Sequence, residues 1–474
     1  MLLENLPPET FAQKLSDPAA KLKLSYLNDL LANSEYLLIQ FMKQQNVWQG
    51  PFPPPPSGFP SSSQTIELGT VLYLFNNPAQ IADPDIRKYA QYAKGALGLP
   101  DSLLTTINYN WIVSHVLVYD DGSIISGGKY ETYDQGWFAA FLNMVITDLE
   151  DAWFGFQSGS PNPIPLKPRA GSNEVLIALV GDWGTGDNTA AAVMNQLVGQ
   201  VPRYIVHVGD VYYSGTPATG SMAGTYFHPG EEKNNLVAVW PKTNDPSNYS
   251  FTLNSNHEMY TGANGLYGDA LTSTTPFHAQ QGLTYFALSL GGWTILGLDS
   301  AYFGTSSDAF MSGYIGGDIF NRDQINWISG LNLDPSRTIV LTHHTGFEWD
   351  GSGFMALWDQ VNGALGGDPY AWYWGHVHNG IVYNSPVTMN GTNGFPQTTK
   401  TFARCLGHGA LPYGEATVLN GNPAVKWMEK GPGLLPNGFG TLRFRLNGNG
   451  MVDSIQEQFY HIGSSAPVYS GLLF

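Results

Sequence analysis

Five short segments of this chain carry acidic, amide, phenol and imidazole side chains, which are groups that hold metal ions. In chain order they are residues 181–184 (GDWG), 209–213 (GDVYY), 256–258 (NHE), 340–344 (VLTHH) and 375–378 (GHVH). Each alone is weak evidence, because a Gly-Asp pair is common in turns. Together they supply two carboxylates, an amide oxygen, a phenol and at least three imidazoles, the donors that iron, manganese and zinc prefer. The ordered set therefore predicts a metal site.

The residue types also suit a site that holds two ions. Such a site cleaves phosphoesters when one ligand is shared, so that the ions sit about 3.5–4 Å apart and hold the attacking and leaving oxygens. A carboxylate can bridge two ions, and Asp210 is central in the motif order. Asp182 would hold the first ion, and Asn256 would bring a neutral oxygen to the second. His376 and His378 are two positions apart on an extended segment, so they can reach the same site while contacting different ions.

These segments resemble the calcineurin-like metallophosphoesterase superfamily and, within it, the purple acid phosphatase-like branch. The superfamily commonly has His two positions after the first Asp, where this chain has Gly184. Tyr213, three positions after Asp210, matches the Gly-Asp-x-x-Tyr segment that gives purple acid phosphatases a tyrosinate ligand. The resemblance covers about residues 174–378. It does not cover the first 170 residues, where plant-type members carry a fibronectin-like domain.

The resemblance implies a ligand set and a pair of ions, iron with zinc, manganese or a second iron. The implied ligands of the first ion are Asp182, Asp210, Tyr213 and His378, and those of the second are Asp210, Asn256, His343 and His376. His343 is preferred to His344 because Val340-x-x-His343 matches the family spacing. Tyr212 competes with Tyr213 for the phenol position.

The resemblance also implies roles beside the metal ligands. His257 would contact the phosphoryl group or the leaving oxygen, with Glu258 orienting it. The adjacent histidines that some plant enzymes carry further along are absent, so leaving-group protonation would fall to His257, His344 or another residue. Ser255 stands where the family has Gly, and we expect strain in that turn.

Composition limits the partners of this protein. Its 474 residues carry a formal net charge of −17, and the 21 Lys and Arg residues form no run, which argues against a nucleic-acid surface. The apolar stretches are too short to cross a membrane. Cys405 is the only cysteine, so an intrachain disulfide is excluded. The N-terminus lacks the features of an export signal, so we expect a cytoplasmic protein by default and leave the compartment open.

The elements that must position these residues predict an α/β fold, a metallophosphoesterase sandwich of two mixed β-sheets flanked by helices. Short apolar runs at 174–180, 204–208, 338–341 and 371–374 read as buried strands that each end at a candidate ligand. Such clustering beyond strand ends is what open α/β sheets show. We expect a partly helical N-terminal module of unknown role at 1–170 and the catalytic domain at 171–474.

Further elements are expected outside these strands. Helices are predicted within residues 10–46, 83–94, 136–153 and 323–331, with a helix start at Asp17-Pro18 and a stop at Gly95. A proline-rich spacer should occupy residues 51–58, and a strand residues 111–119. Residues 283–290 and 293–298 should form a hairpin, and 440–446 and 453–460 a terminal antiparallel pair.

The function expected from this set is hydrolysis of a small phosphomonoester by a metal-bound hydroxide. Two alternatives remain open. One is a phosphodiesterase acting on a nucleotide or another small diester, and the other is a non-catalytic metal-binding protein of the same fold. The completeness of the ligand set favours an enzyme.

Overall fold

The computed structural model describes most of the chain. The described residues are 3–44, 67–104, 117–118, 124–125, 129–130, 134–242, 249–317, 319–412, 419–431 and 434–474. The proline-rich spacer at 51–58 and most of the strand expected at 111–119 lie outside them.

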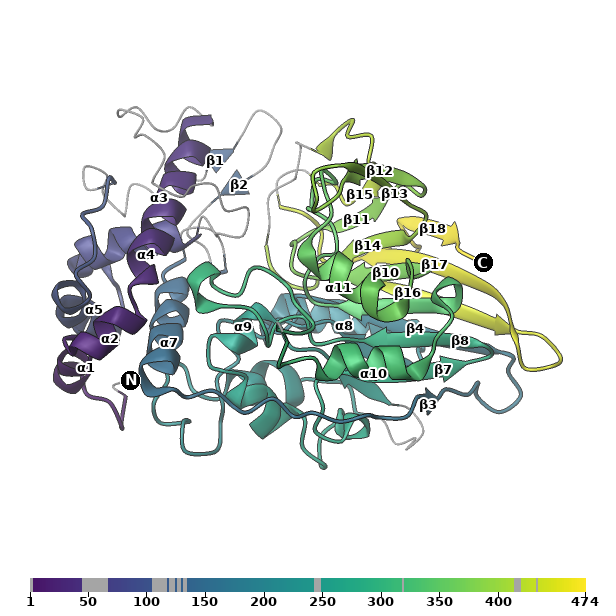
Figure 1. Cartoon of the computed structure of the whole chain (residues 1–474), viewed down its shortest axis with the longest axis horizontal. Helices are drawn as coiled ribbons and strands as arrows, with labels where there is room; N and C mark the ends of the chain where they lie inside the picture. Colours follow the sequence, from purple (N-terminus) through teal and green to yellow (C-terminus); the bar gives the residue numbers. More distant parts are fainter. Residues whose placement is uncertain are drawn as a thin grey trace.

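Two large β-sheets form the centre of the fold (Figure 1). In spatial order, one contains β18 (Tyr469–Leu472), β17 (Val452–His461), β16 (Gly438–Leu446), β4 (Glu174–Val180), β5 (Tyr204–His207) and β6 (Ser250–Thr252). The other contains β15 (Val425–Met428), β11 (Gly380–Tyr383), β14 (Phe402–Leu406), β10 (Ala371–Trp374), β9 (Thr338–Thr342), β8 (Trp293–Gly297), β7 (Phe286–Leu290) and β3 (Ile164–Pro165). Two small pairs are β1 (Leu117–Val118) with β2 (Ile124–Ile125), and β12 (Val387–Asn390) with β13 (Pro396–Thr399).

Both large sheets are mixed, with a parallel centre. Strands β4, β5 and β6 run parallel, as do β8, β9, β10 and β14. The long strands β16 and β17 pair antiparallel and join the first sheet through β4. The predicted α/β sandwich of two mixed sheets flanked by helices is therefore confirmed.

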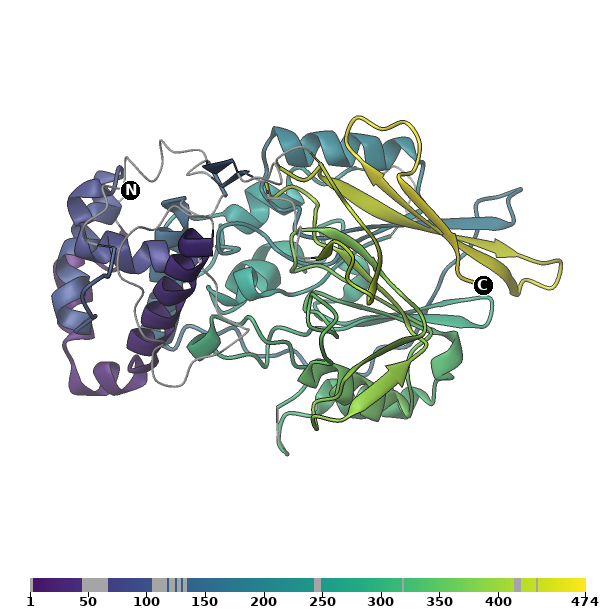
Figure 2. The same ribbon diagram turned by 90° about the horizontal axis from the view of Figure 1, so that it is seen from above.

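Helices cover the outer faces of the two sheets, which face each other in Figure 2. These helices are α8 (Asn188–Gly199), α10 (Asp323–Leu331) and α11 (Ala356–Leu365), and α9 (Asn256–Met259) is a single turn. A helical group lies at one end of the sandwich and contains α1 (Pro8–Leu15), α2 (Pro18–Lys23), α3 (Tyr26–Gln44), α4 (Glu67–Asn76), α5 (Pro84–Leu97) and α7 (Gly136–Glu150). Short 3-10 or π turns are η1 (Pro78–Gln80), η2 (Glu232–Val237), η3 (Leu266–Ala270), η4 (His278–Gln280), η5 (Ser306–Asp308) and η6 (Pro335–Arg337).

Strand β4 shows how the sandwich is packed. Its residues Val175, Ile177 and Leu179 belong to the apolar cluster between the two sheets, whereas Ala178 and Val180 belong to the cluster on the outer face. This alternation follows from the two-residue period of a strand. The outer cluster continues without a break into the N-terminal helices. The N-terminal region and the first sheet thus share one core, while the boundary near residue 171 remains a prediction.

Most expected elements are present with small shifts at their ends. Asp17 caps α2 through a side-chain bond to the amide of Ala19, as predicted. The hairpin of β7 and β8 and the terminal pair of β16 and β17 are confirmed. The predicted stop at Gly95 was wrong, because α5 continues to Leu97 and ends at Gly98. Gly98 has φ of 66°, the left-handed conformation that ends many helices, whereas Gly95 stays helical.

Candidate metal centre

The predicted ligands come together beyond the ends of strands from both sheets. Asp182 follows β4, Asp210 follows β5, and Asn256 opens α9 after β6. From the second sheet, His343 follows β9, and the segment with His376 and His378 joins β10 to β11. Since β4, β5 and β6 run parallel, as do β9 and β10, each group of ends meets at one edge. The structure thus brings six of the seven predicted ligands into one cluster.

His343 lies at the middle of one half of this cluster. The ring is fully buried, and its Nδ1 lies 2.9 Å from the carbonyl of Val208, so Nδ1 carries the proton. Burial lowers the pKa of His343, which keeps the ring neutral. The unprotonated Nε2 then presents its lone pair to the cluster. It faces Asn256 Oδ1 at 2.9 Å, Asp210 Oδ1 at 3.2 Å and His376 Nδ1 at 3.2 Å.

The other half contains Asp182, Tyr212 and His378. His378 Nε2 lies 3.4 Å from Asp182 Oδ1 and 3.4 Å from the hydroxyl of Tyr212. The Tyr212 hydroxyl also donates to Asp210 Oδ2 at 2.5 Å, so the Asp210 carboxylate reaches both halves. Burial and the charge of Asp210 raise the pKa of Asp182 well above its ordinary value.

The backbone is strained at three of these residues. Asp182, Asp210 and His376 have φ of 55°, 79° and 66°, in the left-handed region that residues with a Cβ rarely adopt. Each such residue costs about 1–3 kcal/mol, and such strain gathers at functional sites. Gly209 also has a positive φ of 100°, and a Cβ there would lie 2.7 Å from His343 Nδ1. Only glycine leaves room for that imidazole.

Tyr213, the seventh predicted ligand, does not join the cluster. Its hydroxyl donates to Asp134 Oδ2 at 2.5 Å, and its ring packs on Tyr130 and Trp137. Tyr212, its competitor in the sequence, occupies the position beside Asp210 instead. The prediction that Tyr213 lies in the cluster was wrong, because the Asp134 carboxylate, from the N-terminal region, binds its hydroxyl.

His257 lies at the edge of the cluster, with Nε2 3.9 Å from Asp210 Oδ2. Its Nδ1 donates to the carbonyl of Tyr213 at 2.6 Å, which points Nε2 toward the centre. Glu258 was expected to orient this ring, but among the described residues its carboxylate has no hydrogen bond with the imidazole. The Glu258 carboxylate accepts from the Ser255 hydroxyl, and its Oε1 has no partner. The Tyr213 carbonyl, not the Glu258 carboxylate, holds Nδ1 of His257.

Ser255 causes no strain where the family has glycine. Its φ of −141° and ψ of 176° are extended, and it caps α9 by accepting from the amide of His257 at 3.1 Å. The prediction of strain at Ser255 was wrong. The turn needs an N-cap, and serine is a favourable residue in that position.

His344 is close to the cluster but has no nitrogen left for it. Its Nε2 donates to the carbonyl of Phe310 at 2.7 Å, and its Nδ1 lies 3.0 Å from the Ser300 hydroxyl. Burial and the neighbouring His343 lower the pKa of His344 to about 3, so the ring stays neutral. His344 does form a compact group with His343 and His376. Its hydrogen bonds argue against a role in proton transfer, because a transfer would leave a buried partner unpaired.

The donor set fits metal ions. Asp182, Asp210 and His343 place donor atoms within 4.8 Å of one another, and all three are buried. The Asp210 Oδ1 atom has no hydrogen bond, and the salt-bridge partners of both aspartates among the described residues are histidines. Buried lone pairs that face one another repel unless a cation lies between them. Carboxylate, imidazole and amide donors suit iron, manganese or zinc.

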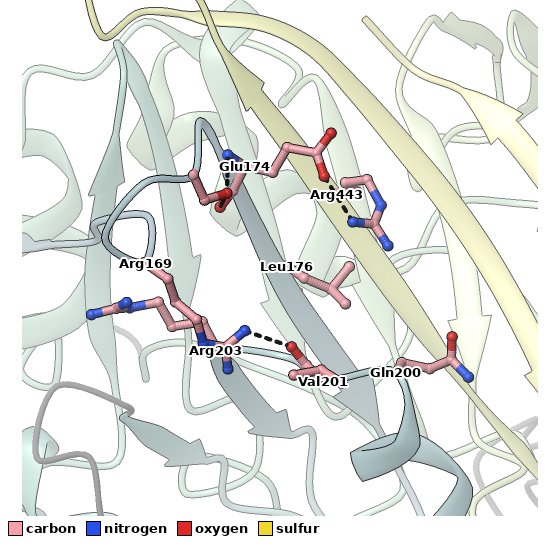
Figure 3. A pocket seen from close by; sticks show the side chains of 8 residues that line it. Arg169, Glu174, Leu176, Gln200, Val201, Arg203 and Arg443 are labelled. Atoms are coloured by element: carbon pink, nitrogen blue, oxygen red, sulfur yellow. Dashed lines mark hydrogen bonds and ion pairs between the residues drawn. The ribbon is translucent and has the colours of Figure 1, made fainter.

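A concavity lies at the opposite end of β4 (Figure 3). Arg169, Arg203 and Arg443 line it together with Glu174, the first residue of the strand. Arg443 Nη1 bonds Glu174 Oε2 at 2.9 Å, and Arg169 donates to the carbonyl of Val201 at 2.8 Å. These guanidinium groups have partners within the protein.

No family model and no curated protein matches this chain. Among solved structures, GAP50, the anchor in the inner membrane complex of Plasmodium, is 12% identical with a TM-score of 0.41, covering 64% of this chain and 89% of GAP50. The 5'-nucleotidase precursor from Thermus thermophilus is 11% identical with a TM-score of 0.30, covering 62% of this chain and 56% of the nucleotidase. Neither likeness identifies a function for this chain.

The described helices were also compared with the dimensions of a bilayer. None of them combines the length and the hydrophobicity that crossing it requires.

Proposed function

We propose that this chain is a metal-dependent hydrolase of small phosphoesters, with phosphomonoesters as its substrates. The observation that carries the proposal is the environment of His343 Nε2. This lone pair lies 2.9–3.2 Å from three further donor atoms, and each belongs to a residue type that binds metal ions. A fold seldom buries such an arrangement unless a cation offsets the repulsion.

Each half of the cluster would hold one ion. The first would be held by Asp182, Asp210, Tyr212 and His378, and the second by Asp210, Asn256, His343 and His376. When bound, two such ions lower the pKa of a water and neutralise charge on a phosphoryl group. Asp210 spans both halves and fixes their separation. In this assignment Tyr212 replaces Tyr213 as the phenol ligand of a purple acid phosphatase-like site.

His257 is the proposed proton donor to the leaving oxygen. The carbonyl of Tyr213 holds Nδ1, so Nε2 is the atom that would carry the transferred proton. The ring is mostly buried, and its Nε2 lies 3.9 Å from Asp210 Oδ2, at the edge of the donor cluster. A buried imidazole in a fixed orientation can protonate an alkoxide with little further loss of conformational entropy.

The charge of the protein is consistent with a small substrate. A net charge of −17 would repel a nucleic acid, whereas a single phosphate group can be drawn to a cation pair inside the site. A small phosphodiester would meet the same donor atoms, so the substrate class is decided by assay.

The test is metal analysis of the purified protein, followed by paired assays on aryl phosphate mono- and diesters. We expect about two equivalents of metal and faster hydrolysis of the monoester. Faster hydrolysis of the diester would replace the monoesterase assignment with a phosphodiesterase. Two bound ions without turnover of either would indicate a non-catalytic metal-binding protein, and absence of metal uptake would reject the proposal.

A further inference from the structure

Helix α7, from the N-terminal region, contacts two of the segments that carry candidate site residues. Asn143 Nδ2 donates to the Ser214 hydroxyl at 2.8 Å, four residues beyond Asp210. One turn later, Thr147 Oγ1 donates to the carbonyl of Tyr260 at 2.8 Å, just after α9. Both hydrogen bonds are buried. Helix α7 therefore ties the Asp210 loop to the helix that begins with Asn256.

Asp134, just before α7, binds the tyrosine that was expected at the metal site. Its Oδ1 accepts from the amide of Gly136 at 2.9 Å, and its Oδ2 accepts from the Tyr213 hydroxyl and the Tyr130 amide, each at 2.5 Å. A Cβ at residue 136 would overlap the Tyr213 ring, so glycine allows this approach. One carboxylate thereby fixes both the start of α7 and the position of Tyr213.

The chain of contacts continues from Tyr213 to His257. The Tyr213 carbonyl accepts from His257 Nδ1, and the ring of Trp137, in the first turn of α7, lies 5.7 Å from the imidazole. Tyr212 and Tyr260 pack edge-on against the same imidazole at 4.5 and 4.9 Å. The orientation of His257 thus depends on three aromatic side chains and one carbonyl, and part of that support comes from the N-terminal region.

We propose that Asp134 and Trp137 are positioning residues for His257, so that the N-terminal helical region completes the active site. The inference rests on the proposed function, in which His257 protonates the leaving oxygen. Asp134 would act by holding Tyr213, whose carbonyl aims the imidazole, and Trp137 would close the side of the ring that faces α7. Neither residue would touch the substrate or the metal ions.

The test compares Asp134→Ala with Asp148→Ala. Asp148 lies at the other end of α7 and accepts from the Tyr26 hydroxyl at 2.5 Å, so both variants remove a partly buried tyrosine–aspartate bond. For an alkyl phosphate, a poor leaving group, we expect Asp134→Ala to lower kcat roughly 10- to 100-fold, the effect of a misplaced catalytic group. The loss should shrink with p-nitrophenyl phosphate, while KM and metal content stay unchanged. Asp148→Ala should keep kcat per folded molecule.

A double variant supplies the decisive control. In the double variant of Asp134→Ala and His257→Ala, kcat should be little lower than in His257→Ala alone, since both substitutions act through the same imidazole. Independent losses, an equal loss for both leaving groups, or the same loss in Asp148→Ala would overturn the positioning role. If Asp134→Ala does not fold, Tyr213→Phe removes only the hydroxyl and should show the same pattern more weakly, whereas wild-type kcat in Tyr213→Phe would overturn it.

A readout without turnover separates this inference from the proposed function. In protein with 15N-labelled histidine rings, the His257 signal, assigned by its absence in His257→Ala, should show a protonated Nδ1. That pattern should change in Asp134→Ala and in Trp137→Leu but not in Asp148→Ala. An unchanged His257 signal would overturn the positioning role even in an active enzyme. A wild-type protein that cleaves no phosphoester would reject the proposed function, and the ring signals would still decide whether Asp134 positions His257.

Discussion

The two ends of β4 carry polar groups in different states. Beyond its last residue, Asp182 joins a cluster in which His343 Nε2 faces Asn256 Oδ1 and Asp210 Oδ1, and three residues of this cluster have left-handed φ angles. At its first residue, Glu174 pairs with Arg443, and Arg169 donates to backbone carbonyls. Both ends gather charged side chains. At Glu174 they pair with an opposite charge or with carbonyls, whereas near Asp182 the lone pairs of buried Asp210, Asn256 and His343 face one another.

This difference favours the end with Asp182 as the candidate functional end, a choice that charge or shape alone would not make. A concavity lined by arginines could suggest an anion site in an acidic protein, yet internal partners already bind those groups. Backbone strain of about 1–3 kcal/mol at each of Asp182, Asp210 and His376 has a cost that the rest of the fold must offset. Selection retains such a cost where a function requires it.

The largest effect is expected for Asp210→Asn, because this carboxylate reaches both halves of the cluster. The variant should lose metal from both positions, and activity should fall close to background. Metal content by mass spectrometry and hydrolysis of an aryl phosphate measure the two effects. Asp182→Asn is the matched control and should keep the second ion. Retention of most metal and turnover by Asp210→Asn would show that Asp210 does not bridge.

His257→Ala should keep both ions yet lose roughly 10²–10⁴-fold in kcat if the imidazole is a general acid. The loss should shrink for substrates with good leaving groups, which need no proton. Rates for a series of aryl phosphates check this dependence. An equal loss across the series would indicate stabilisation of charge on the phosphoryl group, and loss of metal would make His257 a ligand.

Tyr212→Phe should have a smaller effect on turnover but a visible one on colour. A phenolate bound to Fe(III) absorbs visible light, so iron-loaded, oxidised protein should be violet to pink, and Tyr212→Phe should remove the band. Tyr213→Phe should keep it, since that hydroxyl bonds Asp134. Absorption spectra of the two variants measure the difference. Loss of the band in Tyr213→Phe alone would restore the assignment made from motif spacing.

The smallest effect is expected at the other end of β4. Arg443→Ala removes a pair whose side chains are 35% and 38% exposed, so solvent screens most of the interaction. The free energy of unfolding should fall by at most about 0.2–1 kcal/mol. Urea denaturation measures this change, and metal content and activity should match the wild type. A loss of either would mean that the two ends of β4 are coupled.

Local patterns in the sequence predicted most of the site. Asp182 and Asp210 were predictable because each follows a short apolar run, and such runs form buried strands that end together at one sheet edge. The same pattern placed His343 and His376. The roles of Glu258 and His344 could not be read in this way. Ser255 and Glu258 are three positions apart, the spacing of a capping box, so this partner of Glu258 has a local signature. No spacing reveals the Phe310 carbonyl that binds His344.

By itself, the sequence determined the fold class, the strands and the donor atoms available at their ends, because hydrophobic period and turn chemistry are local properties. Only the tertiary structure decided which of two adjacent tyrosines faces the cluster. Tyr213 is held by Asp134, 79 positions earlier, and His343 presents Nε2 because Val208, 135 positions away, binds Nδ1. Neither contact has a signature in the chain, since residues so far apart meet only once two sheets and a helical layer have packed together.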